Sequence, residues 1–342
     1  MESEIRDIEE LDKRLSEPTA AVREVVAGLE GDFLLLGAGG KMGPSLAWML
    51  RRSVEATGGK RRVIAVSRFT VPGQREWLEA RGVETVACDL LDEEGLARLP
   101  EAGNVMYLAG LKFGATGREP SLWAMNTHLP GMVARRFRRS RMVIFSTGNV
   151  YGLKAAGAGG SSESDPVEPA GEYAMSCLGR ERIFEYFGQR HEIPMVLIRL
   201  NYASELRYGV LVDLARRVWG GEPVDCSTGQ FNTIWQGDAN AFAIQAFGRV
   251  AVPAAVVNVT GDGELGVREI CGRFAELMRR EAKFVGTESG TALLSDARLC
   301  REWFGEPRVS VDQMIRWVAD WVMRDGPTLD KPTMFEKRDG RF

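Results

Sequence analysis

A short apolar run that leads into a glycine-rich turn and then a helical pattern constrains the fold more than any other segment. Phe33–Leu36 is followed by Gly37, Gly40 and Gly43. Glycines at this spacing let the backbone turn tightly, approach a pyrophosphate, and pack the helix against the strand, with the anion facing the helix N-terminus. Glycine-rich turns alone are weak evidence, but the strand before and the helix after supply the required context. The segment therefore predicts dinucleotide binding at the edge of a parallel sheet.

Short apolar runs alternate with longer amphipathic stretches along the rest of the chain, which is typical of crossover units. We expect strands over residues 33–37, 62–67, 84–88, 104–108, 142–147 and 195–200. We expect helices over residues 43–56, 73–81, 121–138, 171–189, 208–219, 266–280 and 311–323. The predicted fold class is α/β, a Rossmann-type doubly wound parallel sheet with a smaller C-terminal substrate lobe and an N-terminal helical extension.

The pattern also predicts a division into domains. Residues 1–30 form the helical extension, with helical segments near 4–15 and 19–29. Residues 31–200 form the dinucleotide-binding domain, to which a return segment over 231–257 is added. Residues 201–230 and 258–342 form the small substrate-binding lobe. The Gly/Ser-rich stretch 155–162 predicts a flexible loop at the carboxyl edge of the sheet, where ligands bind in such folds.

Length, charge and cysteine usage exclude several classes of protein. The chain has 342 residues, 44% of them hydrophobic, and a net charge of −3, so it can bury a full core and has no overall attraction to nucleic acid. No stretch approaches the roughly 20 apolar residues of a bilayer span, and the acidic start lacks the pattern of a signal peptide. The five cysteines are far apart and only two histidines occur, so neither a disulfide framework nor a metal site is expected. We expect a cytoplasmic protein.

The end of the second strand bears on which dinucleotide is bound. An NAD site normally offers a carboxylate to the adenosine ribose there, and that carboxylate would repel a 2′-phosphate. This chain offers Ser67 and Arg68 instead, a hydroxyl and a guanidinium suited to phosphate recognition. Asp89, which closes the third strand and precedes Leu90, is placed to reach the adenine edge. The sequence favours NADP over NAD.

With these residues in place, roughly residues 32–240 resemble the extended short-chain dehydrogenase/reductase family, in which sugar-nucleotide epimerases and dehydratases are prominent. The glycine pattern matches, the run from Leu108 to Lys112 is similar to UDP-galactose 4-epimerase, and Asn126 fits the family's helix asparagine. The resemblance implies a small-molecule substrate and a homodimer formed through the helices near 121–138 and 171–189. The residues expected to contact the cofactor are Gly37, Gly39, Gly40, Lys41, Met42, Gly43, Ser67, Arg68, Asp89, Leu90, Leu108, Ala109, Gly110, Asn126 and Tyr173.

The same resemblance assigns catalytic residues and shows where the pattern breaks. Thr147 occupies the hydroxyl position that orients the reacting oxygen, and Tyr173 is the tyrosine of the family's Tyr-x-x-x-Lys pair. Cys177 stands where the lysine belongs, and a thiol cannot supply the cation that lowers a tyrosine pKa towards neutrality. Lys112 or Arg180 could supply it; otherwise the site acts slowly or at high pH, or binds cofactor without turnover. Burial on a packed helix is the commoner role for a cysteine such as Cys177, which argues against its acting as a nucleophile.

Three further departures bear on the substrate. The family's 4,6-dehydratases carry Asp and Glu after the hydroxyl position, and here Gly148 and Asn149 stand there, which ranks elimination below simple redox chemistry. Tyr202 takes the place of a family asparagine, Asn201 comes one residue early, and the short lobe suggests a ligand smaller than a nucleotide sugar. Asp238 is expected to be a helix N-cap.

The leading hypothesis is an NAD(P)-dependent oxidoreductase or epimerase that acts on a hydroxyl or carbonyl group of a sugar or sugar nucleotide by hydride transfer. Tyr173 would be the acid/base, Thr147 would orient the oxygen, and Lys112 is included among the catalytic residues. The alternative is a cofactor-binding protein with little or no redox turnover, a sensor or scaffold, because Cys177 replaces the lysine.

Overall fold

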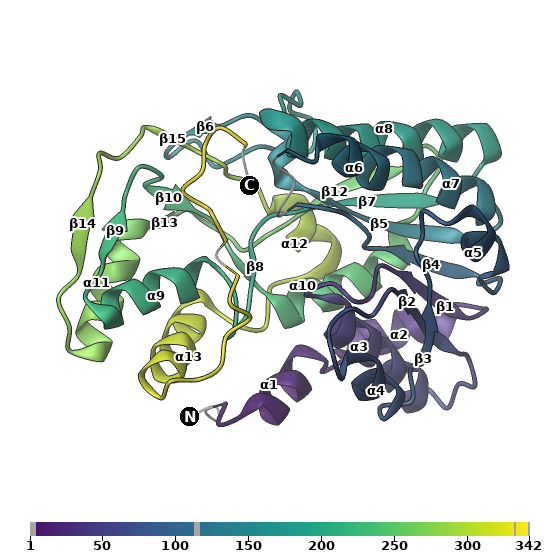
Figure 1. Ribbon diagram of the computed structural model, residues 1–342, viewed down its shortest axis with the longest axis horizontal. Coiled ribbons are helices and arrows are strands. Elements are labelled where there is room, and N and C mark those ends of the chain that lie inside the picture. The colour runs from purple at the N-terminus through teal and green to yellow at the C-terminus, as the bar shows by residue number, and fades with distance from the viewer. Residues whose placement is uncertain (1–4, 113–116, 332, 341–342) are drawn as a thin grey trace.

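A seven-stranded parallel sheet forms the centre of the computed structural model, which describes residues 5–112, 117–331 and 333–340 (Figure 1). The strand order is β12-β7-β5-β4-β1-β2-β3, and every neighbouring pair is parallel. The strands are β1 (Phe33–Leu36), β2 (Val63–Ser67), β3 (Glu84–Ala87), β4 (Asn104–Tyr107), β5 (Arg141–Thr147), β7 (Met195–Leu200) and β12 (Ala255–Val259). The predicted α/β class and all six predicted strands are confirmed.

Two helical layers cover the sheet, because alternate residues of each strand point to opposite faces. Phe33 and Leu35 of β1 join one core with α2 (Ala20–Gly28), α3 (Gly43–Ala56) and α10 (Gln236–Gln245). Leu34 and Leu36 join the other core with α5 (Glu93–Arg98), α7 (Leu129–Arg136) and α8 (Gly171–His191). Residues of β1 and β4 are buried on both faces, which explains their unbroken apolar runs.

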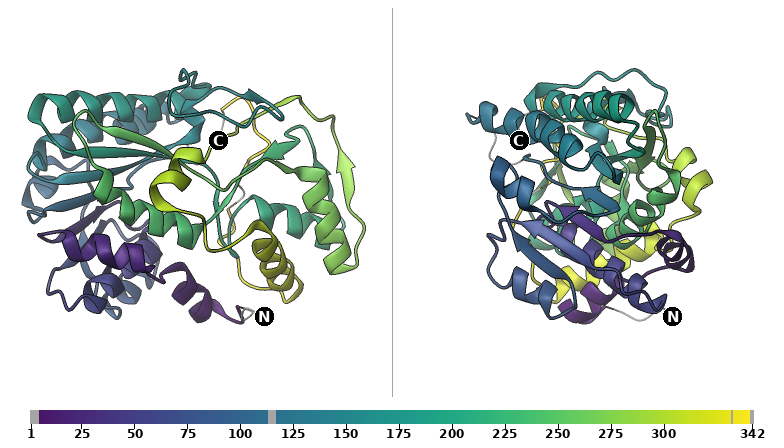
Figure 2. Two further views of the ribbon diagram at one scale, coloured as in Figure 1. Left: turned by 180° about the vertical axis from the view of Figure 1, so that it is seen from behind. Right: turned by 90° about the vertical axis from the view of Figure 1, so that its right-hand side faces the viewer.

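A second core lies in the lobe beside the sheet (Figure 1). It contains α9 (Val210–Gly220), α11 (Val267–Met278) and α13 (Val311–Met323), with β9 (Pro223–Asp225) paired to β14 (Lys283–Val285). The first helix, α1 (Ile8–Leu15), contributes Leu11 and Leu15 to this core, while Val22 and Val26 of α2 belong to the sheet. The view from behind in Figure 2 shows these purple N-terminal helices running from below the sheet to below the lobe. The two helices therefore connect the two cores.

Short elements join the two parts of the molecule. β8 (Ala203–Ser204) pairs with β11 (Ile234–Trp235), β10 (Gln230–Phe231) with β13 (Leu265–Gly266), and β6 (Lys154–Ala155) with β15 (Thr291–Ala292). The remaining helices are α4 (Gln74–Glu79), α6 (Glu119–Trp123), α12 (Arg298–Phe304), a π-helical segment Ala124–His128, and the 3₁₀ helices Gly148–Val150 and Ala246–Arg249. After α13, residues 327–331 and 333–340 cross in yellow from the lobe to α8, and we call these two stretches the strap (Figure 1).

Four details differ from the sequence predictions. The helix expected over 121–138 is α6, the π-helical segment and α7 in succession. Of the return segment 231–257, the central sheet receives only β12, because α10 intervenes. Asp238 is no N-cap: it lies inside α10, which begins after Trp235, and its carboxylate accepts hydrogen bonds from Arg308 Nε and Val309 N, each at 3.0 Å. The loop 155–162 is anchored, since the amides of Gly157 and Gly159 donate to Glu264.

Among the described residues, no helix is long and apolar enough to cross a membrane. The same part of the chain brings no three His, Cys, Asp or Glu side chains together in a way that could hold a metal ion.

Candidate active site

The glycine-rich turn connects β1 to α3, and its three glycines have different roles. Gly37 has φ +88°, and a Cβ there would lie 2.6 Å from the backbone of Ala109. A Cβ on Gly43 would overlap the carbonyl oxygen of Ala38, so this glycine lets α3 pack against the turn. A Cβ on Gly40 would meet nothing closer than 3.5 Å, and Gly40 lines a cavity. Since α3 begins there without a side-chain cap, its first backbone N–H groups and its dipole suit an anion.

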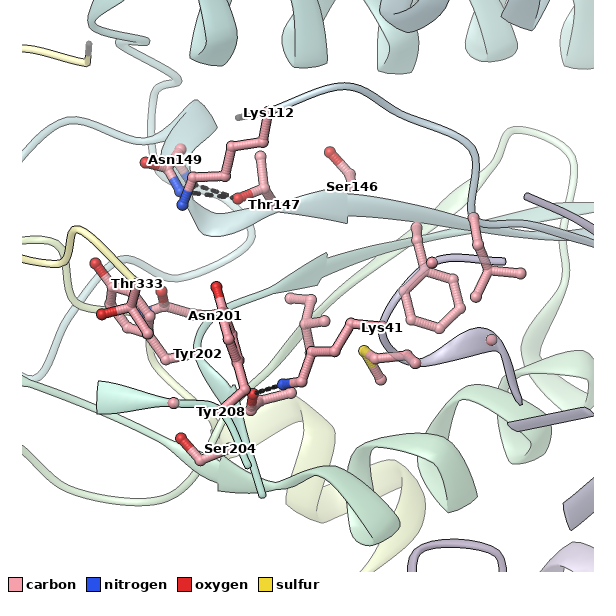
Figure 3. Close-up of a pocket in the computed structure, with 18 of the residues that line it drawn as sticks. Lys41, Lys112, Ser146, Thr147, Asn149, Asn201, Tyr202, Ser204, Tyr208 and Thr333 are labelled. Atoms are coloured by element: carbon pink, nitrogen blue, oxygen red, sulfur yellow. Dashed lines mark hydrogen bonds between the residues drawn. The ribbon is translucent and has the colours of Figure 1, made fainter. Parts of the chain in front are cut away.

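This cavity lies between the turn, the carboxyl ends of β4, β5 and β7, and the lobe (Figure 3). The predicted site residues that line it are Gly37, Gly40, Lys41, Met42, Gly43, Leu108, Lys112, Thr147 and Tyr173. The cavity has two ends: the glycine end around Gly37–Gly43, and the tyrosine end formed by Lys112, Thr147, Asn149 and Tyr173. The fold thus brings the three predicted catalytic residues and part of the predicted cofactor set to one cavity.

Sequence reasoning missed most of the lobe's contribution to the cavity. The sequence marks Asn149, Asn201 and Tyr202 as departures from a family pattern but does not place them in the site, and the structure shows that all three line the cavity. The further lining residues are Phe145, Ser146, Leu200, Ala203, Ser204, Tyr208, Gly209, Val210 and Thr333. A local signal existed for Ser146, which precedes Thr147 in the strand motif. None existed for Tyr208 or Thr333, because only tertiary packing brings them to the site.

Ser67, Arg68 and Asp89 lie beyond the cavity, at the ends of β2 and β3. Gly39 lies so close to Ser67 that a Cβ there would overlap the Ser67 hydroxyl. The Arg68 and Asp89 side chains are 61% and 48% exposed, and Arg68 Nη1 lies 4.0 Å from Asp89 Oδ2. Leu90 is buried in the core of the second sheet face. The Arg68 and Asp89 side chains are thus accessible to solvent outside the cavity.

Asn126 is fully buried and braces the segment that follows β4. Its Oδ1 accepts hydrogen bonds from Leu111 N and Arg180 Nη2, both at 2.9 Å. Its Nδ2 donates to Leu111 O at 2.9 Å and to Ser176 Oγ at 3.0 Å. A Cβ on the neighbouring Gly110 would lie 2.6 Å from Arg180, and neither Ala109, Gly110 nor Asn126 lines the cavity. Gly110 and Asn126, which were predicted to contact the cofactor, pack against α8 and hold it against the end of β4.

Thr147 and Tyr173 face one another at the tyrosine end. Thr147 Oγ1 accepts hydrogen bonds from the Asn149 backbone N–H at 3.2 Å and from Asn149 Nδ2 at 2.9 Å (Figure 3). The Tyr173 hydroxyl makes hydrogen bonds with the Thr147 and Cys177 side chains. Burial raises the pKa of Tyr173 above its ordinary value, and Cys177 raises it further, while Arg180 and the Thr147 hydrogen bond act in the opposite direction. Tyr173 is therefore protonated at neutral pH.

Cys177 lies beneath Tyr173 in a small apolar cluster with Val150 and Tyr151, and it is 0% exposed. Burial raises the pKa of its thiol, despite opposing effects from Arg180 and the Tyr173 hydrogen bond. A buried thiol with a raised pKa is a poor nucleophile. Its position agrees with a packing role on α8.

Two cations approach Tyr173 from different sides. Arg180 is 6% exposed, donates to the Phe145 carbonyl at 2.8 Å and to Asn126, and is fixed under the cavity floor. Lys112 reaches the cavity itself, with Nζ 5.6 Å from the centre of the Tyr173 ring. Burial lowers the pKa of Lys112 to about 8. Arg180 thus provides a fixed positive charge and Lys112 one that can titrate.

Lys41 crosses from the glycine end to the lobe. Its Nζ donates to the Ala203 carbonyl at 2.5 Å and lies 4.3 Å from the centre of the Tyr208 ring (Figure 3). Burial lowers the pKa of Lys41 to about 8, with Glu205 opposing the shift. The cavity therefore has one lysine at each end.

A buried ion pair supports the floor of the site. Arg199 Nη2 lies 2.8 Å from Glu181 Oε2, and both side chains are almost fully buried. Ser146 Oγ donates to Glu181 at 2.5 Å, and Arg199 Nη1 donates to the Tyr151 hydroxyl at 2.7 Å. The network joins β5, β7 and α8, the elements that position Thr147 and Tyr173.

Comparison with known proteins gives a family and a set of related folds. Residues 33–206, just over half of the chain, match the sequence profile of the NAD dependent epimerase/dehydratase family. No curated protein sequence matches the chain.

Three solved structures illustrate the similarity of fold. A UDP-glucuronic acid 4-epimerase from Bacillus cereus, solved with UDP-glucuronic acid and NAD, is 17% identical with a TM-score of 0.70, over 86% of this chain and 99% of that one. A UDP-glucose 4-epimerase from Thermotoga maritima with UDP-glucose is 16% identical with a TM-score of 0.70, over the same shares. A UDP-glucose 4-epimerase from Thermus thermophilus with NAD is 20% identical with a TM-score of 0.68, over 84% and 98%.

Proposed function

Because this chain belongs to the NAD-dependent epimerase/dehydratase family, we propose that it binds a nicotinamide dinucleotide and catalyses hydride transfer at a hydroxyl-bearing carbon of a sugar substrate. The observation that carries this proposal is the presence of the glycine end and the Thr147–Tyr173 pair in one cavity. The related folds are solved with NAD or with UDP-sugars, which agrees with this chemistry.

The residues at the glycine end fit the pyrophosphate of such a cofactor. Gly40 leaves space beside the first turn of α3, where backbone N–H groups and the helix dipole favour an anion. Gly37, Gly40 and Met42 would hold the pyrophosphate, and Leu108 would line the path towards the nicotinamide. When bound, the nicotinamide ring supplies the site that accepts or donates hydride.

The chain's own residues would handle the proton. Tyr173, protonated at neutral pH, would donate its hydroxyl proton to a substrate carbonyl oxygen as negative charge develops there, and Thr147 would hold that oxygen. The Arg180 charge would stabilise the phenolate that remains. Oxidation needs the reverse transfer to a phenolate, so the raised pKa favours reduction near neutral pH. Gly148 and Asn149 supply no acid or base for elimination.

NADP is the dinucleotide that we propose, because of the residues at the end of β2. The exposed guanidinium of Arg68 and the hydroxyl of Ser67 would face the adenosine ribose. Arg68 Nη1 lies 4.0 Å from Asp89 Oδ2. A 2′-phosphate would compete with this carboxylate for the guanidinium. A phosphate carries more charge than the carboxylate and offers more acceptor oxygens, which favours the exchange.

A homodimer is also part of the proposal. An apolar groove on α6, α7 and α8 is lined by Trp123, Met132, Ile183 and Phe187, and Trp123 is 37% exposed. Exposed apolar patches of this kind often mark interfaces between subunits. Light scattering of the purified protein should give twice the mass of the chain, and Trp123→Glu should give the monomer.

A second candidate function is cofactor binding without turnover, as in a sensor or scaffold. The specific observation in its favour is Cys177, which accepts a hydrogen bond from Tyr173 where a lysine would lower the pKa of Tyr173. Both candidate functions predict the same affinity for the dinucleotide. Only the enzyme would also reduce the bound dinucleotide when a substrate is added.

Calorimetric titration of the purified chain with NADP⁺ and NAD⁺, followed by absorbance at 340 nm with a panel of sugars, tests both functions. We expect uptake of a dinucleotide and a change at 340 nm with at least one sugar. Uptake with no change across the panel would favour the sensor, and no uptake at millimolar dinucleotide would overturn both.

A further inference from the structure

We propose that the substrate is a single sugar unit that carries a carboxylate or phosphate and no nucleotide, and that Lys112 binds this anion beside the reacting carbon. The inference rests on the proposed function, because it names the substrate class of the same cavity. Two separate observations carry it: the charge of the cavity wall and the path of the strap.

The described wall of the cavity carries two lysines and no carboxylate. Its other polar members are hydroxyl and amide groups, among them Ser146, Asn149 and Thr333. A cation in a partly enclosed, low-dielectric site attracts an anion much more strongly than it would in water. Burial lowers the pKa of both lysines to about 8, so both still carry positive charge at neutral pH, and a bound anion would raise the pKa again. The wall therefore favours ligands that carry negative charge at both ends.

The two lysines serve different ligands. Lys41 comes from the glycine end, where the cofactor pyrophosphate would lie against the first turn of α3, and its amine now donates to the Ala203 carbonyl of the lobe. Lys112 enters from the segment after β4, and Figure 3 shows its amine beside Asn149 and Thr147. Since Thr147 and Tyr173 would hold the reacting oxygen, an anion bound to Lys112 must lie within a few bonds of the reacting carbon.

Asn149 makes this end compatible with an anion. Its side chain occupies the place next to Thr147 and donates a hydrogen bond to Thr147 Oγ1 at 2.9 Å. A carboxylate at this position would repel a charged substrate, whereas a neutral amide does not. The same residue that removes the acid/base group for elimination thus permits a negatively charged ligand.

The strap begins on the lobe side of the cavity. The backbone N–H and Oγ1 of Thr333 both donate to Asp213 of α9, at 2.8 and 2.6 Å, and Thr333 lines the cavity. Phe335 is 7% exposed and packs against Phe231, with ring centres 6.1 Å apart. These contacts hold the strap against the lobe core.

The other end of the strap reaches α8. Arg338 donates to the Thr291 carbonyl and to Thr291 Oγ1, each at 2.5 Å. Gly340 lies so close to Ala170 that a Cβ would overlap its carbonyl oxygen, and α8 begins at Gly171, two residues before Tyr173. Thr333 and Tyr202 thus form part of the cavity wall on the side of the lobe, and Phe335, Arg338 and Gly340 line a small neighbouring pocket together with Asn149. A nucleotide attached to the sugar on this side would have to displace the strap.

Direct binding measurements test the charge and the size of the substrate together. Protein saturated with NADP⁺ is titrated with D-glucuronate, D-galacturonate, D-glucose 6-phosphate, D-glucose and UDP-glucose. We expect at least one anionic single sugar to bind, and D-glucose and UDP-glucose to bind at least tenfold more weakly. The uronates and the sugar phosphate distinguish a carboxylate from a phosphate as the anion. Failure of every anionic probe, or equal binding of UDP-glucose, would overturn the inference.

Two matched variants locate the anion site. Lys112→Met should weaken binding of the anionic sugar by about tenfold or more and leave NADP⁺ affinity unchanged, because the lost contact is a charge-assisted hydrogen bond. Lys41→Met should weaken NADP⁺ binding instead. An anionic sugar that binds equally well to Lys112→Met would contradict the assignment.

Opening the strap tests the size limit. A chain that ends after Gly326 should gain measurable binding of UDP-glucose, and the milder Arg338→Met should show a smaller gain. Circular dichroism and retained NADP⁺ affinity report whether the shortened chain is folded, and if it is not, Arg338→Met alone decides. Unchanged exclusion of UDP-glucose in folded variants would contradict the role of the strap. NADP⁺ binding is measured separately in every experiment. Absence of NADP⁺ binding would contradict the proposed function, whereas normal NADP⁺ binding with the wrong sugar preference would contradict only this inference.

Discussion

The glycine end and the tyrosine end of the cavity are built in different ways. The glycine end comes from one continuous segment, Gly37–Gly43, and it retains the spacing that its family uses. The tyrosine end combines residues from four parts of the chain, above Cys177: Lys112 follows β4, Thr147 ends β5, Asn149 lies in the 3₁₀ helix after it, and Tyr173 lies on α8. The difference shows that one local segment determines the wall at the glycine end, whereas the wall at the tyrosine end depends on the packing of several elements.

The comparison is tested most severely at Tyr173. Tyr173→Phe should reduce turnover by about 10²- to 10⁴-fold, the usual contribution of a general acid, and change NADP⁺ affinity far less. Initial rates at 340 nm and calorimetry measure the two effects. Tyr186→Phe is the matched control, because Tyr186 lies on the same helix and is 55% exposed. Equal activity of Tyr173→Phe and the control would remove Tyr173 from the mechanism.

Substitutions at the glycine end should affect dinucleotide affinity rather than the chemical step. Gly40→Ala should weaken dinucleotide binding by about tenfold to a hundredfold with little change in melting temperature, since its Cβ has space until a pyrophosphate arrives. Gly43→Ala should instead lower the melting temperature, because its Cβ would overlap Ala38. If both variants behave alike, the different roles of these glycines are wrong.

The pH dependence of the oxidation rate tests the effect of having Cys177 in place of a lysine. Since the pKa of Tyr173 is raised, its phenolate forms only at high pH, and the rate of substrate oxidation should rise continuously with pH up to about 10. The rate of reduction should change little near neutrality, where the phenol is intact. A bell-shaped oxidation profile centred near pH 7 would contradict the raised pKa.

Cys177→Lys should move the oxidation profile to lower pH and increase the rate at pH 7 by about tenfold, because a cation four residues after Tyr173 lowers its pKa. Cys177→Met is the control, with similar bulk and no charge. A rate at pH 7 that the lysine leaves unchanged would favour the sensor over the enzyme.

The smallest effect is expected beyond the cavity, at Arg68. Arg68→Ala should weaken NADP⁺ binding by about fivefold to tenfold and leave NAD⁺ binding nearly unchanged, since the lost contact is charge-assisted but exposed to solvent. Arg98→Ala, a similarly exposed arginine on α5, should change neither affinity. Equal loss for both dinucleotides would show that Arg68 does not recognise the 2′-phosphate.

The sequence predicts the elements whose pattern is local. The predicted helix 43–56 has the bounds of α3, and the strand 195–200 those of β7. The bounds of α10 were not predicted, because all ten of its residues are buried and it shows no amphipathic period; only the expected N-cap at Asp238 indicated a helix there. The helix α5 was missed because six residues give too short a pattern.

The site residues were likewise predicted where they lie in a local sequence motif. Thr147 and Tyr173 lie in recognisable motifs, and the structure brings both to one cavity. The position of Asn126 could be read from the sequence, but its use as a brace between Leu111 and α8 depends on contacts across about 50 residues. Tyr208 and Thr333 reach the cavity only because the lobe folds against the sheet.

The N-terminal helices limit how the molecule can move. With Leu11 and Leu15 held in the lobe and Val22 and Val26 held under the sheet, any wide hinge opening would extract one pair from its core. Exposing two such side chains costs about 3–6 kcal/mol, so the lobe and the sheet should move relative to one another by only small amounts. Under the proposed function, entry and exit of substrate would then depend on local movement of a peripheral segment, and detachment of that segment could limit turnover.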